Sequence, residues 1–146
     1  MHLVTRNEMI MMKKIVLLFV LGLFVNSCST ETQEPYLFYL MPTYQVVMPE
    51  TSSLNNVSNI IVKYRRPSTC HTFNGFNYES SGFTRTVSIE LVKVVKETCL
   101  TDGQSVVEIM LPFKPTELGT YHFKFWSGTS PQGEKLYIEH EIEVNQ

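Results

Sequence analysis

Apolar and polar residues alternate over several short stretches of this chain, a pattern that predicts β-strands with one buried face. In residues 59–66, the residues Ile60, Val62 and Tyr64 share one face. The last apolar stretch places Leu136, Ile138, Ile142 and Val144 opposite Glu139, Glu141 and Glu143. His140 shares that apolar face and is interpreted as a structural core histidine. Apolar residues do not recur at helical spacing after the N-terminal region, so the pattern predicts an all-β domain.

Two stretches depart from simple alternation. Residues 36–48 are apolar and aromatic, and Met41-Pro42 interrupts them. Because proline cannot donate to a strand ladder, we predict either two short strands or an edge strand broken there. Residues 67–82 are rich in Ser, Asn and Gly, and we predict a long loop. Loops of this length are uncommon in compact domains unless they are pinned or functional, and Cys70 offers the pin.

Residues 84–100 form the longest extended stretch. Their apolar residues change parity after Leu91: Val87, Ile89 and Leu91 come first, then Val92 and Val94. This change predicts a β-bulge near Leu91. The following Asp102-Gly103 is a strong hairpin signal, because the two central residues of such a turn need positive φ. We therefore predict that this strand pairs directly with a return strand, whose apolar face carries Val107, Ile109, Leu111 and Phe113.

Residues 117–123 read Glu-Leu-Gly-Thr-Tyr-His-Phe and resemble the acidic-x-Gly-x-Tyr-x-Cys corner of immunoglobulin-like sandwiches. The resemblance implies that Gly119 and Tyr121 form a structural corner, with the tyrosine hydroxyl bonded back to the backbone. The inward side chains would be Tyr121, Phe123 and Phe125, and the outward ones His122, Lys124 and Trp126. We predict an immunoglobulin-like antiparallel β-sandwich of about seven strands over residues 36–146. A lipocalin-like barrel is the structural alternative, but it usually needs more strands.

The N-terminal region has the layout of an export signal. Lys13 and Lys14 precede an apolar run from Ile15 to about Val25, which is expected to enter the membrane as a signal-peptide helix. About eleven residues at 1.5 Å each span roughly half of a ~30 Å hydrocarbon core, so a permanent transmembrane anchor is not expected. We assign residues 1–27 to this signal peptide, with Met11 or Met12 as a possible true start.

Val25-Asn26-Ser27-Cys28 resembles the lipobox of bacterial lipoproteins, in which the cysteine is acylated and becomes the new N-terminus. The resemblance implies lipidation of Cys28, an outer-membrane location in the cell envelope, and a layout like that of small Bacteroidota lipoproteins. Asn26 departs from the usual pattern of small or apolar residues. An ordinary cleaved signal peptide with an incidental cysteine is the alternative. Residues 28–35 are then the lipidated cysteine and a polar tether.

Removal of residues 1–27 leaves nine basic and thirteen acidic residues, a formal charge of −4, which does not suit a nucleic-acid partner. The remaining 119 residues suit one domain. With Cys28 lipidated, Cys70 and Cys99 are an even pair in an exported chain, and we predict a disulfide between them. A metal site formed by Cys70, His71, Cys99 and another histidine is the alternative, but no metal-binding spacing supports it. The sequence predicts neither a metal nor a cofactor.

One candidate binding surface combines arginines with the aromatic residues of residues 67–82. Its members would be Arg65, Arg66, Arg85, His71, Phe73, Phe76, Tyr78 and Phe83, and Trp126 is a separate exposed candidate. The arginines are expected to gather near Cys70, where a basic aromatic patch would suit an acidic glycan or a protein partner. The alternative is that these aromatic residues cap one end of the sandwich.

The sequence contains no familiar catalytic motif, so the leading hypothesis is a non-enzymatic protein. It would be a lipid-anchored interaction or accessory module of the cell envelope. The first alternative is a carbohydrate- or small-ligand-binding lipoprotein of an outer-membrane uptake system. The second is an envelope hydrolase that uses Cys70 and His71, which requires a free thiol of depressed pKa.

Overall fold

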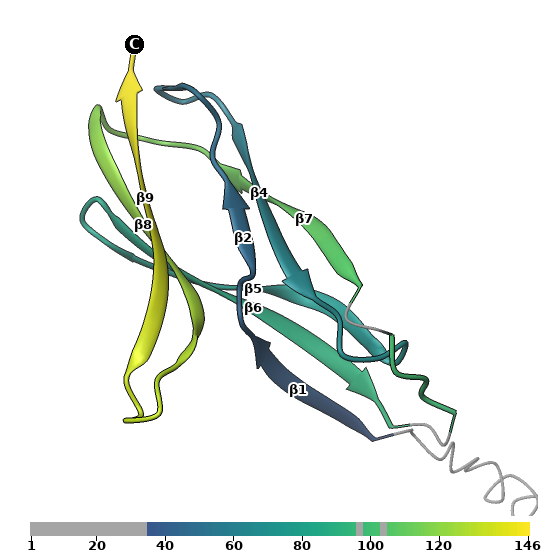
Figure 1. Ribbon diagram of the computed structural model, residues 1–146. Coiled ribbons are helices and arrows are strands. Elements are labelled where there is room, and N and C mark those ends of the chain that lie inside the picture. Colours follow the sequence, from purple (N-terminus) through teal and green to yellow (C-terminus); the bar gives the residue numbers. More distant parts are fainter. Residues whose placement is uncertain (1–34, 96–97, 103–104) are drawn as a thin grey trace, which may run out of the picture. The chain divides into compact units, whose positions relative to one another are not determined.

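The computed structural model describes residues 35–95, 98–102 and 105–146 (Figure 1). The predicted signal peptide, Cys28 and residues 29–34 lie outside the described residues. Within the described part, the secondary structure is nine strands in two sheets, without a helix. None of those residues belongs to a helix long and apolar enough to cross a bilayer. The prediction of an all-β domain is confirmed.

The two sheets differ in size. The larger sheet contains β1 (Tyr36–Met41), β3 (Ser52–Ser53), β5 (His71–Ser81), β6 (Thr84–Val94), β8 (Gly119–Thr129) and β9 (Lys135–Asn145). The smaller sheet contains β2 (Gln45–Val47), β4 (Ser58–Arg65) and β7 (Val106–Phe113). β1 and β2 are therefore two short strands separated at Met41-Pro42, as the sequence predicts, and the break carries the chain from one sheet to the other.

β6 is the strand around which the larger sheet is built. β5 pairs with one edge of β6 along almost its whole length, and two strands share the other edge. β1 pairs antiparallel with residues 89–94, and β8 pairs in parallel with residues 84–87. β3 and β9 form a second parallel pair. The larger sheet is thus mixed rather than wholly antiparallel as predicted, because β8 occupies the part of the β6 edge that β1 leaves open.

The inward faces of the two sheets share one core. Phe113 of β7 packs edge-on against Tyr121 and Phe123 of β8, with the ring centroids 5.0 Å apart in each pair. The alternating patterns predicted for β4, β7 and β8 are confirmed, since the buried side chains include Ile60, Val62, Tyr64, Leu111, Phe113, Tyr121, Phe123 and Phe125. His140 of β9 lies edge-on to Phe125 at 6.5 Å between ring centroids, on the same apolar face.

The long loop predicted for residues 67–82 is wrong. Most of this segment is β5, which turns into β6 through Gly82 and Phe83, where Gly82 has a φ of 55°. Among the described strands β5 pairs with β6 alone, and most of its residues are exposed, so polar residues are tolerated there. The β-bulge predicted near Leu91 lies in β5, between Phe73 and Gly75 and across from Leu91, rather than in β6.

The hairpin predicted at Asp102-Gly103 is wrong as well. β7 pairs with β4 in the smaller sheet, and both edges of β6 are occupied by strands of the larger sheet. β6 and β7 each have a strongly apolar face. In opposite sheets these faces bury a common core, whereas a hairpin would set them side by side in one sheet. Gly103 lies outside the described residues.

The predicted corner before β8 is present. The hydroxyl of Tyr121 donates to the carbonyl oxygen of Glu117 at 3.3 Å, and the Glu117 N–H donates to that hydroxyl at 3.3 Å. Gly119 between them has a φ of 135°, and a Cβ there would lie 3.3 Å from Phe83 Cε1. A side chain at residue 119 would therefore be strained and crowded, which explains the glycine.

Candidate functional site

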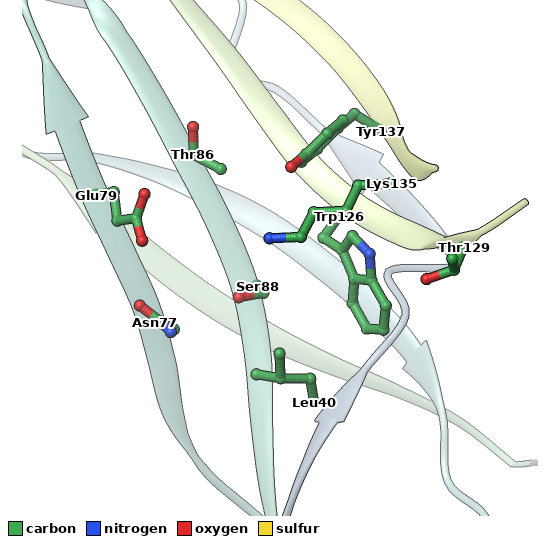
Figure 2. Close-up of a pocket in the computed structure, with 9 residues that line it drawn as sticks. All are labelled: Leu40, Asn77, Glu79, Thr86, Ser88, Trp126, Thr129, Lys135 and Tyr137. Carbon is green, nitrogen blue, oxygen red and sulfur yellow. The ribbon is translucent and has the colours of Figure 1, made fainter. Parts of the chain in front are cut away.

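The outward face of the larger sheet contains an open cleft of about 180 Å³, which we term the outer-face cleft (Figure 2). It lies where β1 and β8 diverge along the edge of β6. Five strands line it, with the residues Leu40, Asn77, Glu79, Thr86, Ser88, Trp126, Thr129, Lys135 and Tyr137. Most of these side chains can make hydrogen bonds, and two are large aromatic rings that carry a polar group.

Alternation along β6 and β5 makes the floor and one wall of the cleft. Val87 and Ile89 point into the core and are fully buried, so Thr86 and Ser88 point outward. The register sets Glu79 of β5 opposite Thr86, and Asn77 opposite Ser88. The threonine and serine side chains are short, so they form the floor of the cleft. The longer Asn77 and Glu79 side chains extend further from the sheet and form one wall.

The opposite wall comes from β8 and β9. Trp126 pairs with Tyr137, and Thr129 pairs with Lys135, so all four occupy the outward face. Figure 2 shows Trp126, Lys135 and Tyr137 on one side and Asn77 and Glu79 on the other, with Thr86 and Ser88 between them. The register of β8 shifts directly after Trp126, and the Thr43 N–H donates to the Trp126 carbonyl oxygen at 2.9 Å. That hydrogen bond fixes the indole-bearing backbone to the segment that follows β1.

The charges of the outer-face cleft are balanced. Glu79 supplies one carboxylate and Lys135 one ammonium group, from opposite walls. Lys124, just beyond the cleft, lies with Nζ 4.9 Å from the Tyr137 ring centroid and 3.1 Å from a Glu139 carboxylate oxygen. Such a surface offers a flat aromatic face, donors and acceptors, and little net charge. It is chemically equipped to hold a polar, uncharged ligand by stacking and hydrogen bonds.

The predicted arginine cluster is not assembled. Arg65 stacks over the Tyr44 ring with Cζ 4.1 Å from its centroid, whereas Arg66 forms an ion pair with Asp102. The hydrogen bond from Arg66 lowers the pKa of the Asp102 carboxyl. Arg85 stacks over the Tyr121 ring at 4.8 Å and donates to the Gly82 carbonyl oxygen at 2.5 Å.

Strand register explains this separation. Cys70 is next to His71, which pairs with Lys93, and Arg85 lies eight residues before Lys93 on the same strand. At about 3.3 Å per residue, eight residues of β-strand extend roughly 26 Å. Arg85 therefore lies near the opposite end of β6 from Cys70. The strands were predicted to flank one loop, but β5 runs the length of β6 and holds the two places apart.

The aromatic residues of β5 divide between the core and the surface. Phe73 and Phe76 are partly buried against the core, with ring centroids 5.1 Å apart. They therefore pack as part of the core and not as an exposed binding surface, whereas the sequence-based alternative is that these aromatic residues cap one end of the sandwich. Tyr78 is 39% exposed, and partial burial raises the pKa of its hydroxyl. Phe83 packs edge-on against Tyr121 at 5.0 Å. Of the predicted binding residues, Trp126 lines the outer-face cleft.

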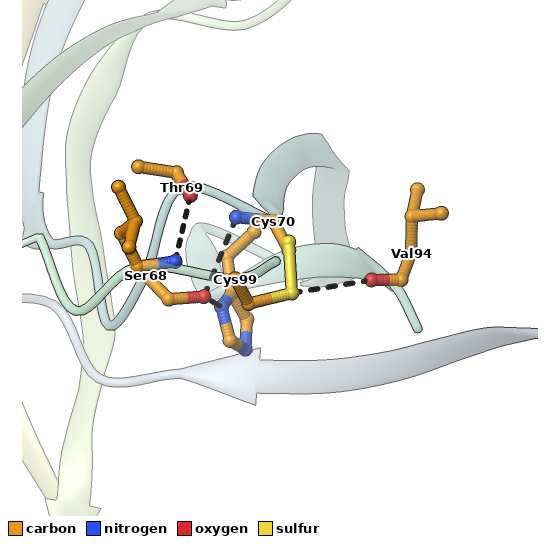
Figure 3. Close-up of a disulfide and its surroundings, with 7 residues drawn as sticks. Ser68, Thr69, Cys70, Val94 and Cys99 are labelled. Atoms are coloured by element: carbon orange, nitrogen blue, oxygen red, sulfur yellow. Dashed lines mark hydrogen bonds between the residues drawn. A yellow bond between two sulfur atoms is a disulfide. The ribbon is translucent and has the colours of Figure 1, made fainter. Parts of the chain in front are cut away.

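The predicted disulfide between Cys70 and Cys99 is present, with their Cα atoms 5.5 Å apart (Figure 3). His71 beside it is buried, and its Nδ1 shares a hydrogen bond of 2.8 Å with the Ser68 hydroxyl. Burial lowers the pKa of His71, and the charge of Lys93 lowers it further. In this structure the Cys70 sulfur is bonded to Cys99, so it is not a thiolate that His71 activates. The described residues contain no cluster of three or more potential metal ligands.

Searches against protein-family models, curated proteins and solved structures found no match for this chain. The candidate site therefore rests on its own geometry.

Sequence reasoning identified Trp126 as an exposed candidate but missed the residues around it. The sequence predicts a loop at Asn77 and Glu79, and no sequence pattern distinguishes Lys135 and Tyr137. The alternation of β6 contained the relevant signal, because its outward positions Thr86 and Ser88 are short and polar. These two positions can be recognised as the floor of a cleft only when the neighbours of β6 in the sheet are known.

Proposed function

We propose that this chain is a non-enzymatic, lipid-anchored binding protein of the cell envelope, and that its ligand is a carbohydrate held in the outer-face cleft. The observation that supports this proposal is the arrangement of side chains in the cleft (Figure 2). Its floor is lined by hydroxyl groups and lies between a wall with aromatic rings and a wall with a carboxylate and an amide. This geometry favours the carbohydrate-binding alternative over a purely protein-interacting module.

The chemistry of a sugar matches this arrangement in two respects. A pyranose ring has an apolar face of C–H groups that can stack on the indole of Trp126, which lies partly exposed at the wall. Its hydroxyls both donate and accept, and Asn77, Glu79 and Lys135 together supply both functions. One carboxylate and one ammonium group leave the cleft without a dominant charge. The favoured ligand is therefore a neutral sugar rather than the acidic glycan that an arginine cluster would suit.

Binding without catalysis is supported by the same residues. Hydrolysis of a glycosidic bond usually requires two carboxyl groups that flank the bond, and Glu79 is the one carboxylate among the described residues lining the cleft. The hydrolase alternative needs a free Cys70 thiol, whereas Cys70 is bonded to Cys99.

The lipid anchor rests on the sequence around Cys28. A Cys28→Ala variant expressed with its signal is expected to move from the detergent phase to the aqueous phase in phase partitioning. A variant that stays in the detergent phase would contradict acylation of Cys28. This experiment does not involve the cleft, so its outcome is independent of ligand binding.

For the fold, we propose an immunoglobulin-like sandwich. The support is the Tyr121 hydroxyl, which is hydrogen-bonded to Glu117, and the three-stranded sheet that faces the sheet of β8 and β9. The parallel pairing of β6 and β8 departs from the usual antiparallel neighbours of that fold.

A glycan array probed with the mature protein, residues 28–146, tests the proposed ligand class. We expect binding to neutral oligosaccharides that Trp126→Ala weakens at least about tenfold, because an aromatic side chain at the centre of a site commonly contributes that much. Tyr44→Ala is the matched control, since Tyr44 is 48% exposed and lies outside the cleft. An array without binding, or equal binding by Trp126→Ala and the parent protein, would favour a protein-interacting module.

A further inference from the structure

Exposed apolar side chains gather at the end of the larger sheet where the chain enters the domain. β1 has no charged residue, and all of its residues are at least partly exposed. Tyr36 is 52% exposed and Phe38 63%. The register places Val94 beside Tyr36 and Val92 beside Phe38 on the outward face. The parity change after Leu91 in the sequence therefore marks an apolar surface stripe.

Two further apolar residues extend this stripe beyond the strands. The Val95 N–H donates to the Pro35 carbonyl oxygen at 3.2 Å, which places Val95 next to the start of β1. Leu100 follows Cys99, whose disulfide to Cys70 secures it, and the Thr69 N–H donates to the Leu100 carbonyl oxygen at 3.0 Å. Val95 is 42% exposed and Leu100 69%. We term this surface the apolar end: Tyr36, Phe38, Val92, Val94, Val95 and Leu100.

We propose that the apolar end lies against the surface of the lipid bilayer that carries the protein. This proposal rests on the lipid at Cys28 that the proposed function includes. Tyr36 is eight positions after Cys28 in sequence, and even a fully extended chain over that interval reaches only about 28 Å. The start of β1 is thereby held within about 28 Å of the bilayer surface, and the apolar end includes Tyr36 and Phe38 of that strand.

The residue types fit that location. Tyrosine places an apolar ring against the acyl region and its hydroxyl among the headgroups, and Phe38 and Leu100 supply purely apolar contact. Among the described strands β1 pairs with β6 alone, so contact through β1 would also cover its second edge, which has no charged residue.

Tryptophan fluorescence of tethered protein tests the contact. The mature chain is coupled through Cys28 to a maleimide lipid in phosphatidylcholine vesicles, so that natural acylation is not required. Trp126→Phe removes the native tryptophan, and Phe38→Trp or Leu100→Trp then reports on the apolar end. Leu118→Trp is the matched control, because Leu118 is 46% exposed and lies before β8, near the end of β9.

We expect brominated lipid to quench the indole introduced at residue 38 or residue 100 at least about twofold more than the indole at residue 118, with a blue shift of emission. Equal quenching at all three positions, or none at residues 38 and 100, would overturn the proposal. A blue shift that depends on protein concentration in the absence of vesicles would also overturn it, since it would identify a second copy of the chain as the occupant. Failure of natural acylation would appear in detergent partitioning and leave this measurement unaffected.

Discussion

At the scale of single residues, Tyr121 combines a packing role with a hydrogen-bonding role. Its ring is 1% exposed and contacts Phe83 and Phe113, while its hydroxyl bonds to both backbone groups of Glu117. The ring therefore fixes β8 in the core, and the hydroxyl fixes the turn that leads into β8. The corner was predictable from sequence because its residues form a short local motif, 117–123, that resembles the corner of immunoglobulin-like sandwiches.

Replacing Tyr121 by phenylalanine should separate the two roles. The ring contacts remain and the two hydrogen bonds are lost, so we expect a loss of about 1 kcal/mol in the free energy of unfolding. Urea denaturation measures this loss. Tyr36→Phe, which removes a hydroxyl from an exposed ring, should change stability by less than about 0.5 kcal/mol. Equal effects of the two variants would contradict the role of the Tyr121 hydroxyl.

His71 should make stability depend on pH. Burial holds the pKa of His71 below its ordinary value of 6.5 in the folded protein, and Lys93 lowers it further. The unfolded chain therefore takes up a proton at higher pH than the folded chain does. The stabilising effect is full above about pH 7 and decreases as the pH falls through about 6.5 toward the lowered pKa of the folded state. Denaturation at about pH 7.5 and about pH 5.5, on either side of the ordinary histidine pKa, gives the free energy of unfolding at each pH. The difference between these two free energies should be smaller for His71→Asn than for the parent protein. An unchanged difference would exclude His71 as a source of the pH dependence.

At the scale of strands, β6 shows how far sequence patterns reach. Its inward residues Val87, Ile89 and Leu91 were predicted correctly, because one strand with one buried face produces a local pattern. The parity change after Leu91 was attributed to a bulge, but it reflects outward apolar residues beside β1. The pairing of β6 with β8 is set by contacts between segments distant in sequence. The local turn preference of Asp102-Gly103 is outweighed by burial of the apolar faces of β6 and β7 in one core.

The Cys70–Cys99 disulfide links the start of β5 to the segment after β6. The cysteines are 29 residues apart, and the chain-entropy relation gives a stabilisation of about 3 to 4 kcal/mol for a loop of that size. A Cys70→Ser/Cys99→Ser double variant should therefore lose several kcal/mol in urea denaturation. The parent protein should approach the variant when dithiothreitol is added, whereas the variant should not respond. Equal stability of parent and variant under oxidising conditions would contradict a stabilising disulfide.

At the scale of the whole described domain, the outer-face cleft and the apolar end share the outward face of the larger sheet. Leu40 of β1 lines the cleft, and Tyr36 and Phe38 of the same strand belong to the apolar end. The cleft draws on β1, β5, β6, β8 and β9, so no single segment of sequence contains its pattern. This is why the fold class was predictable and the composition of the cleft was not.

The central claim is that the outer-face cleft binds a neutral carbohydrate against Trp126. Because the chain has a single tryptophan, its intrinsic fluorescence reports on that residue alone. Titration of the mature protein with a neutral oligosaccharide selected on the array should change the emission saturably. Glu79→Gln or Lys135→Ala should weaken the binding severalfold through lost hydrogen bonds. Emission that stays constant while the oligosaccharide binds, or unchanged affinity in both variants, would contradict the account.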